Sequence, residues 1–163
     1  MENLKIISNT SPLINLCKID HLGLIEKLFG QIIIPEAVNY ELFYNKAKTK
    51  LPELRFLFEK SIIIVKTVKN KNFVNLLRSK LDYGEAEAIA LAVEMKADSI
   101  ILDETEARKE ADNLKIKKFG FIGILIKAKK NGLIDDIKSL IDMAIKNGFW
   151  LKKDLYNKII RQL

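Results

Sequence analysis

The sequence predicts an α/β fold in which three layers, α/β/α, enclose a central and mainly parallel sheet of four to five strands. Short β-branched runs alternate with segments of helical periodicity, which is the order found in parallel sheets with right-handed crossovers. The runs are apolar at consecutive positions, which indicates strands that are covered on both faces. These runs lie at residues 5–7, 32–34, 62–65, 99–102 and, more weakly, 116–119.

Proline and polar residues mark where the helices between these strands begin. Proline is favoured at the first position of a helix, because its missing N–H would have no partner there. Glycine commonly follows the last turn of a helix. The helix starts predicted in this way are at Pro12 (after Ser11), Asp20, Pro35 and Pro52, and Gly30 ends the second helix.

The length and composition fit one domain. The chain has 163 residues, 48% of them apolar, which is enough to bury a substantial core. It contains no repeat and no Pro/Gly/Ser-rich linker. We therefore expect a single domain over residues 1–163, with a helical C-terminal portion from about residue 121 in which Gly132 and Gly148 end helices.

Residues 82–92 are rich in small side chains and predict a helix that packs close to the sheet. Glu85 and Glu87 lie in its first turn, where the helix dipole favours carboxylates. Two positions correspond to about 200° around a helix axis, so the two side chains point in different directions. Glu87 should therefore lie away from any site that Glu85 joins.

The net charge of +7, from 28 Lys and Arg against 21 Asp and Glu, favours an acidic partner such as nucleic acid. Solvated lysine-rich faces are an equally good interpretation of the same charge. Aromatic residues mostly fall at apolar-periodic positions, so the sequence does not indicate a stacking platform for single strands.

The single cysteine, Cys17, excludes an intramolecular disulfide framework and a cysteine-built zinc site. It lies among apolar residues and fits a small core side chain. The chain has no long apolar span, and residues 1–5 do not have the form of a signal peptide. We expect a soluble protein of the reducing cytoplasm.

Polar side chains recur near the ends of the predicted strands. Ligands collect outside the carboxyl ends of parallel strands, so residues distant in sequence can converge there. The candidates are Asn9, Glu41, Glu85 and Asp103, with Glu104 and Glu36 in reserve. Three acids and one amide suit Mg²⁺ or Mn²⁺, which favours metal-dependent phosphodiester chemistry. Helix capping is the simpler explanation of each acid taken alone.

Four segments in this order, and a fifth near the C-terminus, are similar to one known family. They are residues 7–14 (ISNTSPLI), 34–42 (IPEAVNYEL), 81–92 (LDYGEAEAIALA), 101–108 (ILDETEAR) and 148–156 (GFWLKKDLY). The chain resembles the PIN-domain nucleases, specifically a bacterial and archaeal subgroup related to VapC-type toxins. The resemblance implies a Mg²⁺- or Mn²⁺-dependent ribonuclease, with an antitoxin protein as a possible partner and a homodimer as the usual assembly.

The resemblance also assigns roles to individual residues. The four catalytic and metal-binding positions of the family fall on Asn9, Glu41, Glu85 and Asp103. We also expect Glu104, the reserve next to Asp103, to be a metal ligand. The polar residue that would contact substrate falls on Ser11. Asn9 is an amide where the family has a carboxylate, and Ile101 stands where many members have Thr or Ser.

Two other classes of function stay open at this point. One is a weak or inactive PIN-like module that binds RNA or protein, because Asn9 supplies no charge to a metal. The other is a nucleotide-binding or phosphatase domain, which the absence of glycine-rich phosphate motifs disfavours. His21, the only histidine, lies far from the candidate site in sequence, so metal chemistry is favoured over histidine acid–base catalysis.

The assembly prediction depends on two apolar segments. Residues 51–58 and 121–126 are rich in Leu, Ile and Phe, and a homodimer could cover them if they were exposed. If they are not exposed, they are ordinary core.

Overall fold

The computed structural model describes residues 3–44 and 51–163 and contains a five-stranded sheet in which every pairing is parallel. The strand order is β3-β2-β1-β4-β5, so the chain crosses over between neighbours and places its first strand in the centre. The α/β/α prediction is therefore confirmed, with five strands. The strands are β1 (Ile6–Ser8), β2 (Ile32–Pro35), β3 (Ile63–Lys66), β4 (Ser99–Ile101) and β5 (Lys118–Phe119).

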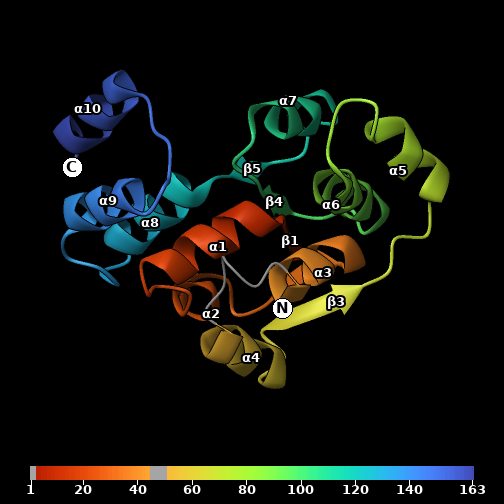
Figure 1. Cartoon of the computed structure of the whole chain (residues 1–163), viewed down its shortest axis with the longest axis horizontal. Coiled ribbons are helices and arrows are strands. Elements are labelled where there is room, and N and C mark those ends of the chain that lie inside the picture. The colour runs from red at the N-terminus through yellow and green to blue at the C-terminus, as the bar shows by residue number, and fades with distance from the viewer. Residues whose placement is uncertain (1–2, 45–50) are drawn as a thin grey trace.

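The helices in the described part of the chain connect these strands and form the C-terminal portion of the molecule (Figure 1). Between β1 and β3 they are α1 (Thr10–Lys18), α2 (Leu24–Phe29), α3 (Glu36–Tyr44) and α4 (Leu51–Glu59). Between β3 and β5 they are α5 (Lys71–Leu77), α6 (Tyr83–Glu94) and α7 (Thr105–Asn113). After β5 they are α8 (Phe121–Lys130), α9 (Ile137–Lys146) and α10 (Lys153–Arg161).

Two apolar cores lie on opposite faces of the sheet. Successive strand residues point to opposite faces, so Ile6 and Ile7 belong to different cores. The first core also contains apolar residues of α1, α2, α4, α8 and α9, and Cys17 is buried within it. The second contains residues of α5, α6 and α7. The sheet is therefore covered on both sides, as its uninterrupted isoleucine runs require.

The helix ends predicted from the sequence agree with the structure better than the predicted helix starts do. Gly30, Gly132 and Gly148 all have positive φ and follow the last turns of α2, α8 and α9, as predicted. Two predicted starts are wrong. Pro35 is the last residue of β2, and α3 begins at the next residue. Asp20 has a φ of 58°, so it reverses the chain after α1, and α2 begins only at Leu24.

The two apolar segments proposed for dimerisation lie mostly in the first core. Leu54 and Leu57 of α4 are buried, and so are Phe121, Ile124 and Leu125 of α8. Phe56 is half exposed. The described part of these segments therefore packs mostly as ordinary core.

In the described residues, no helix combines the length and the apolar character that crossing a membrane would require.

Candidate functional site

The carboxyl ends of the central strands β1 and β4 place Asn9 beside the Asp103–Glu104 pair. The two strands are paired in register, with Ser8 opposite Ile101. The pairing continues one step further, because the Asn9 backbone N–H donates to the Ile101 carbonyl at 3.0 Å. Asn9 is the N-cap residue of α1, and Glu104 is the N-cap residue of α7. Residues 94 positions or more apart thus meet at one edge of the sheet, as the strand-end rule predicts.

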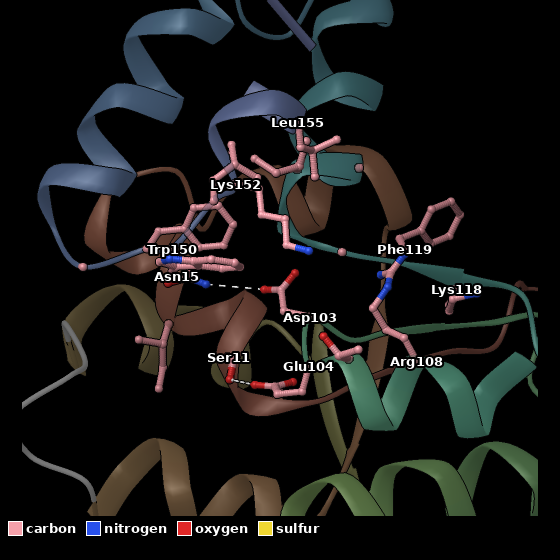
Figure 2. Close-up of a pocket in the computed structure, with 18 of the residues that line it drawn as sticks. Ser11, Asn15, Asp103, Glu104, Arg108, Lys118, Phe119, Trp150, Lys152 and Leu155 are labelled. Atoms are coloured by element: carbon pink, nitrogen blue, oxygen red, sulfur yellow. Dashed lines mark hydrogen bonds between the residues drawn. The ribbon is translucent and has the colours of Figure 1, made fainter. Parts of the chain in front are cut away.

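Glu104 connects directly to two residues at the start of α1. The Asn9 side-chain amide donates to Oε2 of Glu104 at 3.2 Å, and the Ser11 hydroxyl donates to Oε1 (Figure 2). Asn9 is 2% exposed, and its Oδ1 has no hydrogen-bond partner in the described structure. A buried acceptor without a donor is unfavourable, so this oxygen is ready to bind a cation or a donor.

Two helices contact the Asp103 carboxylate, α8 at its first residue and α1 through Asn15. The backbone N–H of Phe121 donates to Oδ1 at 2.7 Å, and the Asn15 side chain lies 3.4 Å from Oδ2. A Cβ on Gly120 would lie 2.7 Å from Oδ1, so glycine leaves the room that this carboxylate occupies. Burial raises the pKa of Asp103 to about 6, and the nearby Glu104 charge adds to the effect.

The Glu41 carboxylate, which extends from α3, lies against Gly84 in the first turn of α6. The Thr10 hydroxyl donates to its Oε2, and a Cβ on Gly84 would lie 2.5 Å from its Oε1. Burial raises the pKa of Glu41, while the bond from Thr10 opposes that rise. The charges of Asp82 and Glu104 also raise it.

Glu85 begins α6 in a reciprocal capping box with Asp82. The Glu85 N–H donates to Asp82 Oδ1 at 2.8 Å, and the Asp82 N–H donates to Glu85 Oε2 at 3.0 Å. Burial raises the pKa of Glu85 to about 7. The charges of Asp82, Glu104 and Glu41 act in the same direction.

Glu87 points away from these acids, and its role is structural. Its side chain is almost completely buried, and its Oε2 accepts from the Ala37 N–H at 2.9 Å in the first turn of α3. Lys71 lies 3.4 Å from its other oxygen. Glu87 therefore ties α3 to α6, the two helices that carry Glu41 and Glu85.

The remaining candidates lie outside the cluster. Glu36 is the exposed first residue of α3. Nδ1 of His21 lies 2.6 Å from the Ile19 carbonyl in the turn after α1, so this ring has a local role.

Sequence reasoning missed three partners of these acids: Thr10, Asn15 and Asp82. Thr10 and Asn15 lie on the buried side of α1, and Asp82 is an exposed helix cap. The available signal was weak: Asn15 is a polar residue within the apolar run of α1.

The acids form two neighbouring sets that do not share one compact centre. Asp103 and Glu104 lie with Asn9, and Glu41 and Glu85 lie with Thr10 and Asp82. Within residues 3–44 and 51–163, no three His, Cys, Asp or Glu side chains are grouped closely enough to hold one metal ion. Mg²⁺ is usually held by one or two carboxylates and retains several waters. Hard cations of this kind prefer oxygen ligands, and these carboxylates and the unbonded Oδ1 of Asn9 supply them.

We expect the metal-free protein to lose stability as pH rises from about 4.5 to about 7. The pKa of Glu85 rises from 4.5 to about 7 in the folded state, and the pKa of Asp103 also rises. An acid with a raised folded pKa binds more protons when folded, so deprotonation favours the unfolded chain. Metal binding needs the deprotonated acids, so Mn²⁺ affinity should increase over the same range.

Thermal melts with and without Mn²⁺ at about pH 5 and about pH 8 measure both effects. Glu85→Gln should flatten the pH dependence of the metal-free melts, and Glu36→Gln should leave it unchanged. A metal-free protein that gains stability toward pH 8 would contradict the expectation.

The chain matches a known family over most of its length. Residues 5–163 match the PIN domain family. No curated protein matches the chain. Because the family match covers nearly the whole chain, the protein belongs to the PIN domain family, whose members are metal-dependent nucleases that typically bind Mg²⁺ or Mn²⁺.

Proposed function

We propose that this protein hydrolyses phosphodiester bonds of RNA with the help of bound Mg²⁺ or Mn²⁺. The observation that carries the proposal is the gathering of carboxylates from separate segments at the carboxyl end of the sheet. Glu41, Glu85 and Asp103 all have pKa values raised by burial and by neighbouring acids. Such a concentration of destabilising negative charge is typical of a site that works with a cation.

The residues that would hold a metal are Asn9, Asp103 and Glu104 in one set and Glu41 and Glu85 in the other. When bound, the ion supplies a water of lowered pKa and neutralises charge that develops on the phosphate. The protein supplies orientation, because Ser11 holds Glu104 and Thr10 holds Glu41 through their hydroxyl groups.

A binding module with a weak or inactive site is the second candidate function. The observation that favours it is Asn9, which brings an oxygen to the site without a charge. Calorimetric titration with Mn²⁺ separates the two, because the ribonuclease should bind the ion, whereas an inactive module should bind it weakly or not at all.

The activity test compares RNA cleavage by the purified protein in Mn²⁺ and in a chelator. Glu41→Gln should lose the Mn²⁺-dependent cleavage, and Glu36→Gln should retain it as the matched control on the same helix. Cleavage that persists in chelator, or that survives Glu41→Gln, would contradict the proposal.

Replacing Asn9 by Asp should tighten Mn²⁺ binding and raise cleavage. The new carboxylate strengthens the attraction to a divalent ion, but it also adds repulsion next to Glu104. We expect the metal-bound protein to gain affinity and the metal-free protein to lose stability. Calorimetry with Mn²⁺ and melts of both metal-free proteins check this. Equal Mn²⁺ affinity in the two proteins would mean that Asn9 does not contact the ion.

The toxin role, an antitoxin partner, homodimer formation and a cytoplasmic location are further parts of the proposal. They are supported by the resemblance to VapC-related proteins and, for the location, by the single cysteine. Light scattering at high protein concentration tests the dimer.

A further inference from the structure

A cavity of about 880 Å³ opens next to Asp103 and Glu104 (Figure 2). Its walls come from α1, the start of α7, β5 and α8, and the stretch that leads into α10. Its volume lies within the usual range for small-ligand sites. Both acids line it, so whatever fills the cavity lies against candidate catalytic residues.

One wall of the cavity carries Trp150, the only tryptophan in the chain. Its side chain is 75% exposed, although an indole is among the most favourable groups to bury. The neighbouring Phe149 packs edge-on against the buried Phe121, with ring centroids 4.9 Å apart. Phe149 therefore anchors this stretch on the core, and Trp150 is held at the cavity with its ring accessible.

Basic side chains share the same cavity: Lys18, Arg108, Lys118 and Lys152. Figure 2 shows Lys152 pointing toward Asp103. In the part of the chain that the structure describes, its ammonium group has no hydrogen bond or ion pair. By contrast, Lys118 pairs with Asp112, and Arg108 donates to the Leu102 carbonyl at 2.8 Å. Lys152 is thus available to an anion.

We propose that this cavity is a subsite for an unpaired nucleotide of RNA, with the base stacked on Trp150 and a phosphate contacted by Lys152. The inference rests on the proposed ribonuclease function and assigns Trp150 and Lys152 as residues that position its substrate. An exposed aromatic ring next to cations is the arrangement by which proteins hold unpaired bases. Bases in a duplex are already stacked on each other and are not available to Trp150.

This proposal departs from the sequence prediction, in which no stacking platform was indicated. That prediction depended on the aromatic residues that fall mostly at apolar-periodic positions. One exposed indole can serve this purpose, because the fold brings Trp150 to the same cavity as Lys152 and Asp103.

The fluorescence of Trp150 tests the proposal directly, because no other tryptophan contributes to the signal. The intact protein is titrated in chelator, which prevents cleavage, with a short single-stranded RNA, its duplex, and the same backbone without bases. Single-stranded RNA should quench the fluorescence and bind most tightly. The duplex and the abasic strand should bind more weakly and quench little.

Two substitutions separate stacking from charge, with binding followed by anisotropy of labelled RNA. Trp150→Leu should weaken single-strand binding about tenfold, the usual size of one base–aromatic stack, whereas Trp150→Phe should retain most of the affinity. Lys152→Gln should weaken binding and reduce its salt dependence. Phe56→Leu, which removes a half-exposed aromatic residue that does not line the cavity, is the control and should change nothing.

Unchanged affinity in Trp150→Leu, equal binding of the abasic strand, or no fluorescence response would overturn the subsite. These results do not depend on cleavage. If Mn²⁺-dependent cleavage is present while Trp150→Leu binds normally, the ribonuclease stands and the subsite fails. If binding depends on Trp150 and no cleavage occurs under any metal, the subsite stands and the ribonuclease fails.

Discussion

Replacing Asp103 by Asn should reduce Mn²⁺-dependent RNA cleavage on the order of 10²–10³-fold, the loss typical of removing one preorganised electrostatic group. The metal-free protein should remain folded and become at least as stable as the wild type near neutral pH. Burial raises the pKa of Asp103 to about 6, so its charged form is unfavourable in the folded state. Asparagine removes this charge and keeps an oxygen that can accept from Phe121.

The matched control is Glu106→Gln, which removes an exposed acid two positions after Glu104. Glu106 pairs with Lys109 on the surface of α7 and should affect neither cleavage nor melting by much. Cleavage assays in Mn²⁺ and melts in chelator measure the two effects. Full cleavage by Asp103→Asn would remove Asp103 from the site. A large loss of metal-free stability would mean that Asp103 serves mainly to hold α8.

The strands and the edge of the sheet at which the site lies could be predicted from local sequence. Buried parallel strands leave continuous runs such as Ile32–Ile33–Ile34, and strand ends in such sheets meet on one edge. Asn9 directly follows β1, and Asp103 is the second residue after the end of β4, so their approach follows from the topology alone. Helix α5 was missed because only Val74 and Leu77 are buried in it, too few to produce a clear period.

The finer arrangement of the site could not be read from the sequence because it depends on contacts between helices. Glu41 and Glu85 lie on different helices, and their separation depends on the packing of α3 against α6. That packing includes the bond from Glu87 to the Ala37 N–H. No local pattern encodes such a contact. The exposure of Trp150 could not be read from the sequence either, because it depends on the packing of Phe149 against Phe121.

Gly84 shows how closely these helices must approach for Glu41 to reach its place. An ideal Cβ on Gly84 would lie 2.5 and 2.8 Å from the two carboxylate oxygens of Glu41, distances that no real contact allows. Gly84→Ala should therefore displace this carboxylate from its bond with Thr10. Displacement of about 1 Å in an active site can cost on the order of 10²-fold in rate. We expect a loss of that size in Mn²⁺-dependent cleavage, together with weaker Mn²⁺ binding.

Stability should change far less than activity in Gly84→Ala, because the obstacle is the end of a flexible side chain. Alanine gains up to about 1 kcal/mol of helix propensity over glycine. Loss of the Thr10–Glu41 hydrogen bond costs about the same.

Gly23→Ala is the control, because Gly23 has a φ of −60° and nothing within 4 Å of the added Cβ. It should leave cleavage unchanged and raise stability by about 0.4–1 kcal/mol. Denaturant melts and Mn²⁺ calorimetry of both variants distinguish a displaced ligand from a damaged fold. If Gly84→Ala keeps wild-type Mn²⁺ affinity and cleavage, the position of Glu41 against Gly84 has no part in the site. If it unfolds while Gly23→Ala does not, Gly84 serves the packing of α3 on α6 instead.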